Sequence, residues 1–356
     1  MIVGEGELLF LKLLRGELPS SQKVYTIGDL QGETVDLSSV DEPDFSDFEV
    51  KNYPHLADYA SRSCPFGCSF CSETLQWGKF RKKSMRQVVD ELSRLSKTYN
   101  RQLFLMSDSL LNPVVTDLSE ELIKRGASIY WDGYFRVDRL SGEMDRSLLW
   151  RRGGFYRARL GVESGSPKIL ELMDKRITVD QIKAAVSSLA HAGIKTTTYW
   201  LIGHPGETEE DFQMTLDLIE DLKEDIYEAW ANVFWYYPYG QVKSGDLREK
   251  SSPLYPANAR DMLIIETRVV AGEPNREQMQ NRMFRFLEHC RKIGVPNLYS
   301  LKDFNAADKR WEKLHKNAAP PLVSFMDGGT FIDENIKVKQ VAFAKNTLKE
   351  DMDFGF

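Results

Sequence analysis

A regular alternation of short apolar runs and longer stretches with helical periodicity most constrains how this chain folds. Six runs over residues 56–240 have the length and apolar content of buried strands: 56–62, 102–107, 129–136, 157–163, 195–203 and 229–236. The clearest helical stretches between them are 85–99, 117–126, 179–193 and 209–222. This alternation predicts parallel strands joined by right-handed crossovers. Six such units predict an α/β fold, a partial (βα)6 barrel of the TIM type, with functional residues at the carboxyl ends of the strands.

The segment before this alternation has a different pattern. Leu8 and Leu11, like Leu9 and Leu13, are at helical spacing, and Pro19 ends the run, which predicts a helix of about three turns. Residues 29–49 then hold eight acidic residues and no basic one, which is typical of a solvated linker. We therefore expect residues 1–54 to be an N-terminal helix and an acidic linker that wraps the following domain.

The segment after the alternation is rich in proline and contains one clear helix, at residues 276–294. Met279, Met283, Phe286 and Cys290 lie on one stripe of that helix. We expect residues 55–245 to be the barrel core and residues 246–356 to be a mainly helical extension that covers it.

Charge and cysteine usage exclude several classes of protein. Lys and Arg number 47 against 53 Asp and Glu, and this net charge of −6 argues against a general nucleic-acid binder. No apolar run approaches the ~18 residues that span a bilayer, and Glu5 and Glu7 stand where a signal peptide carries positive charge. Three of the four cysteines lie within eight residues, which favours a metal site in a reducing cytoplasm. We expect a cytoplasmic protein without nucleic-acid or membrane partners.

The strongest local signal is the cysteine cluster formed by Cys64, Cys68 and Cys71, directly after the first expected strand. Three thiolates at this spacing can bind three irons of a 4Fe–4S cluster and leave the fourth iron open for chemistry. The alternative is a structural zinc site, which needs a fourth protein ligand. His55, His204 and Cys290 are the candidates for that ligand, and none has motif spacing.

Several motifs in the same order resemble one family of enzymes. SRSCPFGCSFCSE contains the cysteines, and GKFRKKS, GVESGSPKIL, DKRIT and LIGHPGETEEDF follow it. Together they resemble the radical S-adenosylmethionine (SAM) superfamily, in the branch usually fused to a cobalamin domain, over about residues 1–245. The resemblance implies that the open iron binds SAM, whose reductive cleavage yields methionine and a 5′-deoxyadenosyl radical that abstracts a hydrogen atom from a substrate. It also implies an electron donor such as flavodoxin or ferredoxin.

The resemblance assigns roles to residues near the strand ends. Phe70 is expected to flank the adenine, with packing beneath the loop as the alternative. Ser107 and Asp108 are expected to contact the methionine amino group, or else to cap a helix. Arg136 at the end of the third strand is expected to pair with the methionine carboxylate, or else with a nearby aspartate.

Further expected SAM contacts follow the fourth and fifth strands. Glu163, followed by Ser164, has a carboxylate suited to a ribose diol or an ammonium group, and a buried carboxylate without such partners is costly. The resemblance places the adenine against Leu201 and Gly203, where a plain tight turn is the alternative.

Two further features have both a functional and a structural interpretation. Cys290 is a candidate hydrogen donor to a substrate radical, or else a small buried hydrophobic residue. The aromatic residues of segment 235–239 are candidates for a substrate wall, or else for core and lid packing. The segment after residue 246 has no further cysteine cluster, so no auxiliary iron–sulfur cluster is expected.

The opening IVGEGE resembles the last stretch of a cobalamin-binding domain, but the Asp-x-His-x-x-Gly loop of such domains is absent from the sequence. We therefore expect a short relative without cobalamin, an interpretation that the initial Met favours. Its expected substrate is a ribosomally made peptide precursor or another natural-product intermediate. The alternatives are the catalytic part of a cobalamin-dependent radical SAM methyltransferase and a non-enzymatic iron–sulfur protein.

Overall fold

The computed structural model describes residues 1–236, 245–255, 268–298 and 300–326. Six strands form one parallel sheet in which the spatial order follows the chain order. Among the described residues the first and last strands pair on one side only, so the sheet stays open. The strands are β3 (Leu56–Asp58), β6 (Leu103–Met106), β7 (Tyr130–Arg136), β8 (Phe155–Glu163), β9 (Lys195–Ile202) and β10 (Glu228–Val233). The six predicted runs and their parallel pairing are thus present in the structure.

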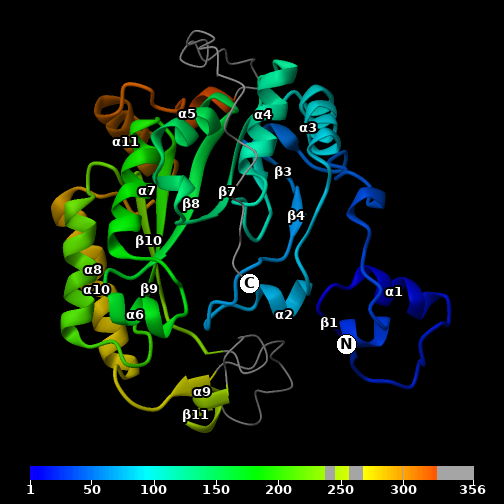
Figure 1. Cartoon of the computed structure of the whole chain (residues 1–356), viewed down its shortest axis with the longest axis horizontal. Coiled ribbons are helices and arrows are strands. Elements are labelled where there is room, and N and C mark those ends of the chain that lie inside the picture. The colour runs from blue at the N-terminus through cyan, green and yellow to red at the C-terminus, as the bar shows by residue number, and fades with distance from the viewer. Residues whose placement is uncertain (237–244, 256–267, 299, 327–356) are drawn as a thin grey trace.

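Helices connect these strands and cover the outer face of the sheet (Figure 1). Their starts are set by local chemistry: the side chains of Thr178 and Thr208 each accept a hydrogen bond from the third helical residue in a capping box. The helices are α3 (Met85–Tyr99), α4 (Val115–Arg125), α5 (Met144–Arg152), α6 (Pro167–Leu172), α7 (Val179–His191) and α8 (Glu209–Asp221).

The two faces of the sheet differ sharply in polarity. Along β8, Ala158, Leu160 and Val162 are fully buried in the main core, among the residues that pack beneath the helices. Alternate residues of a strand face opposite sides of a sheet. The intervening positions of β8, which include Arg159 and Glu163, therefore face the concave side, and both line a cavity there.

The first predicted strand, residues 56–62, is interrupted in the structure. β3 ends at Asp58, and a separate strand β4 (Ser61–Arg62) pairs antiparallel with β5 (Arg81–Lys82). The physical reason is Asp108, whose carboxylate accepts hydrogen bonds from the backbone N–H of Ala60 at 3.0 Å and from the hydroxyl of Ser61 at 2.5 Å. These bonds take the place of ladder bonds and turn the chain away from the sheet.

The N-terminal segment forms a small lobe beside the sheet (Figure 1). Strands β1 (Ile2–Val3) and β2 (Tyr25–Thr26) pair in parallel around helix α1 (Glu7–Leu14), and Leu9, Tyr25 and Leu30 form its core. Helix α1 is about one turn shorter than predicted, because the chain turns at Gly16, which has a φ of 71°.

The acidic linker contains three short 3₁₀ helices, η1 (Ile27–Leu30), η2 (Leu37–Ser39) and η3 (Val50–Asn52). Its later part packs on α3: the backbone N–H of Phe45 donates to the hydroxyl of Tyr99 at 2.9 Å, and Glu42 pairs with Arg94 at 2.9 Å. The linker therefore contacts the domain that follows it, as predicted.

The described part of the C-terminal extension covers the β9–β10 side of the sheet. Helix α10 contributes Phe286 and Cys290 to the main core. No described helix is both long enough and apolar enough to cross a membrane. Tyr237 and Tyr239 of the predicted aromatic wall lie outside the described residues. The elements are α9 (Gly245–Glu249), β11 (Ser251–Pro253), β12 (Arg268–Val270), α10 (Arg276–Ile293), α11 (Leu301–Leu314) and η6 (Leu322–Phe325).

Candidate functional site

One cavity of about 660 Å³ opens at the carboxyl ends of the strands, and Cys64, Cys68 and Cys71 all line it. The three thiols are free, Cys68 is buried, and the other two are partly buried. A backbone hydrogen bond anchors the loop that carries these cysteines. The N–H of Ser69 donates to the carbonyl of Met173 at 2.9 Å. The cysteine loop is therefore tied to the end of α6, 100 residues away in sequence.

Two free thiols of the loop are held in their neutral form by burial, and a cation lies beside the third. Burial raises the pKa of the Cys64 thiol, and burial raises the pKa of the Cys71 thiol to about 11, with the neighbouring cysteines adding to both effects. Nη1 of Arg136 lies 3.2 Å from Sγ of Cys68, and its guanidinium lies 4.2 Å from the ring centroid of Phe66. The thiolate is the form that binds a metal, so the three thiols would lose their protons on ligation.

The donor set fits a cluster better than a single ion. In the part of the chain that the structure describes, no three His, Cys, Asp or Glu side chains converge on one ion position. The zinc alternative therefore has no geometric support there. A 4Fe–4S cubane has its ligands on different irons, so three cysteines spread along one loop of a shared cavity suit it.

The proposed fourth zinc ligands are also engaged elsewhere. Nδ1 of His204 lies 3.0 Å from the carbonyl oxygen of Pro205, and Cys290 is fully buried in the main core. Cys290 is not among the described residues that line the cysteine cavity, and burial raises the pKa of its thiol to about 12. The predicted role as a hydrogen donor is therefore not supported by its position, which is that of a small core residue.

Five of the predicted SAM contacts line the cysteine cavity: Phe70, Ser107, Asp108, Arg136 and Glu163. They come from four separate segments, the cysteine loop and the carboxyl ends of β6, β7 and β8. Ser107 is exposed there, and its backbone N–H donates to the carbonyl of Asp58 at 2.7 Å. The parallel sheet thus assembles these residues at one edge, as strand ends do in α/β folds.

Glu163 has a partner that sequence reasoning missed. Nζ of Lys175 lies 2.6 Å from Oε1 of Glu163 and 5.6 Å from the ring centroid of Phe70. Lys175 is buried and also lines the cavity. The sequence signal for Lys175 is its place in the DKRIT motif. Lys175 reaches the end of β8 only because the chain turns back after α6, which the motif does not show.

Asp108 lines the cavity, and its carboxylate already accepts hydrogen bonds from the protein. Its side chain is buried, and both of its oxygens accept hydrogen bonds from the Ala60–Ser61 turn. Burial raises the pKa of Asp108 to about 6, and those two hydrogen bonds oppose the rise. Asp108 therefore holds the Ala60–Ser61 turn that precedes the cysteine loop, and its direct contact with a methionine amino group stays a prediction.

Three predicted contacts are not brought to this cavity in the described structure. Glu163 has a φ of 71°, which turns the chain so that Oγ of Ser164 lies 3.3 Å from Oγ1 of Thr215 on α8. Leu201 and Gly203 are absent from the lining of the cysteine cavity. Gly203 has a φ of 82°, and a Cβ added to it would lie 2.5 Å from the Met279 side chain of α10. Met279 of α10 therefore covers Gly203, one of the two residues that the adenine was expected to contact.

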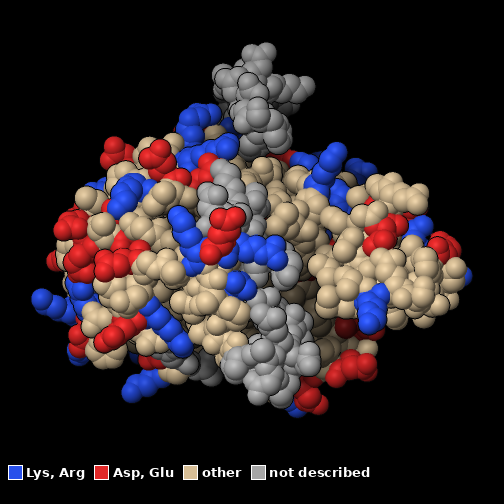
Figure 2. Space-filling view, turned by 90° about the horizontal axis from the view of Figure 1, so that it is seen from below, with Lys and Arg blue, Asp and Glu red and all other residues tan. Residues whose placement is uncertain are grey.

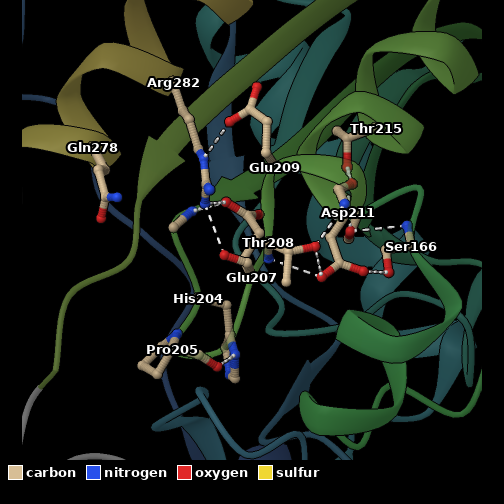
Figure 3. Close-up of polar contacts among 12 residues, drawn as sticks. Ser166, His204, Pro205, Glu207, Thr208, Glu209, Asp211, Thr215, Gln278 and Arg282 are labelled. Atoms are coloured by element: carbon tan, nitrogen blue, oxygen red, sulfur yellow. Dashed lines mark hydrogen bonds and ion pairs between the residues drawn. The ribbon is translucent and has the colours of Figure 1, made fainter. Parts of the chain in front are cut away.

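Figure 3 shows a second polar cluster, behind the end of β9. Glu207 of the GHPGE motif points toward Arg282 of α10, with Nη1 and Oε2 2.8 Å apart, and also accepts from the N–H of Gly203 at 3.0 Å. Burial raises the pKa of Glu207 to about 7, although Arg282 opposes the rise. This motif residue, which sequence reasoning did not single out, fastens the C-terminal extension to the β9 turn.

Fold and site together define an α/β domain with a three-cysteine cofactor site at the carboxyl edge of a parallel sheet. Residues 59–219 match the family model described as the radical SAM superfamily. This stretch of the chain is therefore a radical SAM domain, and enzymes of that superfamily use a 4Fe–4S cluster and SAM.

Curated relatives include several named enzymes. The chain is 29% identical over 264 residues to an uncharacterized methyltransferase of Pyrococcus horikoshii, covering 67% of this chain and 56% of that protein. It is 30% identical over 182 residues to the anaerobic magnesium-protoporphyrin IX monomethyl ester cyclase of Rubrivivax gelatinosus, covering 50% and 32%. It is also 30% identical over 227 residues to the bacteriochlorophyllide d C-12(1)-methyltransferase of Chlorobaculum tepidum, covering 60% and 47%. The chain spans from a third to just over half the length of these relatives.

Two solved structures share the fold. TsrM from Kitasatospora setae, a radical SAM methyltransferase with cobalamin and a 4Fe–4S cluster bound, matches with a TM-score of 0.57 at 14% identity, covering 73% of this chain and 60% of that one. OxsB, a cobalamin-dependent radical SAM enzyme, matches with a TM-score of 0.53 at 21% identity, covering 64% and 36%.

Proposed function

We propose that this chain uses Cys64, Cys68 and Cys71 to hold a 4Fe–4S cluster, binds SAM beside it, and abstracts a hydrogen atom from an organic substrate. The observation that carries the proposal is the single cavity that joins these cysteines to Arg136 and Glu163. A cation and a carboxylate beside three thiols match the charged ends of a SAM molecule.

Each residue of the cavity has a task that follows from its chemistry. The bound cluster would supply the electron that splits SAM into methionine and a 5′-deoxyadenosyl radical. Arg136 places a permanent positive charge against the thiolate of Cys68 and near the site for the methionine carboxylate. Lys175 orients the carboxylate of Glu163 for a ribose diol. The ring of Phe70 limits the access of water to the reacting atoms.

The substrate that we propose is a small natural-product intermediate. The peptide precursor expected from the sequence gains no support from the relatives. The names of the relatives give a protoporphyrin ester, a bacteriochlorophyllide and a cytidylyl phosphonate as substrates, and in one further case a ribosomal protein, uS12, rather than a precursor peptide. We also propose an external electron donor of the flavodoxin or ferredoxin class, because the reductive cleavage of SAM consumes an electron that must come from outside the protein.

The experiment is anaerobic reconstitution of the protein with iron and sulfide, reduction, addition of SAM and quantification of 5′-deoxyadenosine by mass spectrometry. The proposal expects 5′-deoxyadenosine from the wild type and none from Cys68→Ala. A wild type that holds the cluster but never cleaves SAM would instead be the predicted non-enzymatic iron–sulfur protein.

A second candidate is the catalytic part of a cobalamin-dependent methyltransferase. The observation that favours it is the N-terminal lobe, where Phe10 is 57% and Leu14 71% exposed on α1. Figure 2 shows mainly uncharged surface on this lobe. Parallel strands are normally buried on both faces, so β1 and β2 resemble part of a larger α/β unit. Methyl transfer that appears only when a corrinoid is added would select this candidate.

A further inference from the structure

The concave face of the sheet continues below the cysteine site, and one basic residue lies there without an assigned task. Arg159, Gly161 and Glu163 alternate along β8 and line the same cavity. At about 3.3 Å per residue, Arg159 lies roughly 13 Å along the strand from Glu163. Gly161 has no side chain, and Oε1 of Glu163 and Nζ of Lys175 lie over it, 2.7 and 3.0 Å from the place of a Cβ, so this ion pair separates Arg159 from the end of the strand.

Not every N–H donor of the Arg159 guanidinium is used in a hydrogen bond. Its Nη2 donates to Oδ2 of Asp132 at 3.0 Å, whereas its Nε is buried and has no hydrogen-bond partner in the described structure. An orphaned buried donor on a charged group is costly, since it forfeits its bond to water. Nε itself is buried, but the Arg159 side chain as a whole is 16% exposed and lines the cavity, so the guanidinium can meet a ligand there.

The acidic residues nearby do not fully neutralise this region. Oδ2 of Asp132 is shared with Nε of Arg157 at 3.1 Å, and the next carboxylate, Glu228, lies 3.8 Å from Arg157. His55 faces the same group, and burial lowers its pKa, so it is neutral at pH 7. One close carboxylate oxygen thus serves two guanidinium groups, which leaves Arg159 able to bind another anion.

Two tyrosines flank Arg159 on the neighbouring strands. Tyr134 of β7 is in register with Arg159, and Tyr199 of β9 is in register with Gly161. Their ring centroids lie 5.9 Å apart, and Tyr134 is 48% exposed. Burial raises the pKa of Tyr199, and its hydrogen bond with Arg159 opposes that rise. Two partly exposed rings beside a cation form a site for a flat group that carries a negative charge.

We propose that Arg159 binds an anionic group of the substrate, a carboxylate or a phosphate, and that Tyr134 and Tyr199 contact the adjoining part of that molecule. This inference rests on the proposed function, because it assigns the region around Glu163 to SAM and the region around Arg159 to the substrate. An Arg fork binds either oxyanion with two parallel hydrogen bonds.

The test uses three probes that differ only in the group offered to Arg159: phenylacetate, phenyl phosphate and the neutral phenylacetamide. Ligand-observed NMR measures their binding to the reconstituted wild type, to Arg159→Gln, and to Arg139→Gln, which removes an arginine with a 72% exposed side chain outside the cavity. We expect at least one anion to bind the wild type at least tenfold more tightly than phenylacetamide. We expect Arg159→Gln to lose that preference and Arg139→Gln to keep it. The anion that binds more tightly identifies the group.

One further variant separates substrate binding from a structural role. Arg159→Lys keeps the positive charge beside Asp132 but loses the paired N–H donors of the guanidinium. This variant is therefore expected to fold and to bind the anion severalfold more weakly than the wild type.

Equal anion binding by the wild type and Arg159→Gln, or no anion binding by the wild type, would overturn the inference. The probes need no reductant, so a wild type that binds them but forms no 5′-deoxyadenosine contradicts the proposed function alone.

Discussion

Nη1 of Arg136 lies 3.2 Å from Sγ of Cys68, which joins the carboxyl end of β7 to the middle cysteine of the loop. Sixty-eight residues separate the two, so the contact exists only because the parallel sheet brings β7 beside the loop that follows β3 and β4. The same guanidinium lies on the ring of Phe66, which fixes its orientation. A permanent cation is thereby held beside the thiolates and at the edge of the cavity.

Replacement of single cysteines tests which thiols bind iron. Cys68→Ser is expected to reduce the iron and sulfide retained after anaerobic reconstitution to a small fraction of the wild-type content, because a hydroxyl is a poor ligand for a cluster iron. Cys290→Ser is the matched control, since this residue is buried in the main core, and it is expected to retain full iron. Iron loss in the control with retention in Cys68→Ser would reverse the assignment.

Gly161→Ala is expected to weaken SAM binding at least tenfold while leaving the cluster in place. A Cβ at this position would lie 2.7 Å from Oε1 of Glu163 and 3.0 Å from Nζ of Lys175, so the ion pair that faces the ribose site must move. Equilibrium dialysis with labelled SAM measures the effect. Gly6→Ala, where the nearest atom is 3.5 Å away, is the control. Equal affinities in the two variants would show that this ion pair is not at the SAM site.

Glu5 is expected to fasten the N-terminal lobe to the cysteine loop. Its buried carboxylate pairs with Arg62 at 2.8 Å and with Arg81 at 2.9 Å. Removing one partner from a buried ionic group costs about 3–5 kcal/mol, so Glu5→Gln is expected to lower the free energy of unfolding by an amount of this order. Glu7→Gln removes a carboxylate that pairs with the same Arg62 but is 51% exposed, and it is expected to cost less than ~1 kcal/mol. Urea unfolding compares them, and similar losses would contradict this role for Glu5.

The free energy of unfolding is expected to decrease as the pH rises from 4.5 to 7, in part because of Glu207. Burial raises its pKa from the ordinary value of 4.5 to about 7, so in this window the folded carboxyl keeps a proton that the unfolded one has lost. The unfolded state binds fewer protons there, and stability therefore decreases as pH rises, by at most about 3 kcal/mol from this group.

The pH dependence of stability in the wild type is compared with that of Glu207→Gln, whose side chain cannot ionise. Burial also raises the pKa of Asp58 to about 7 and that of Asp108 to about 6, and both groups are present in wild type and variant alike. Chemical unfolding at pH 5 and pH 8 is expected to show a smaller drop in Glu207→Gln than in the wild type. An identical drop in both proteins would place the pKa of Glu207 near its ordinary value.

The strands and helices of the sheet could be predicted because their signals are local. The periodicity predicted α3 at its observed bounds, and all six strand runs coincide with strands to within a few residues. The first run was predicted too long because its interruption depends on Asp108, which follows another strand and takes the N–H of Ala60 out of the sheet.

The site could be predicted only in part, because several of its contacts cross the fold. Cysteine spacing and family motifs located Phe70, Arg136 and Glu163, which the structure places in one cavity. Lys175 and Arg159 were missed because nothing local shows that their side chains meet that cavity. Gly203 was assigned to SAM from the family resemblance, and no local pattern indicates that Met279, 76 residues later, packs against it.

Mössbauer spectroscopy of the iron-57 reconstituted protein, recorded before and after SAM is added, tests the central proposal most directly. With three cysteine ligands, one of the four irons is open, so we predict that SAM changes the signal of that iron alone. A single-ion spectrum, or four irons whose signals do not respond to SAM, would contradict the account.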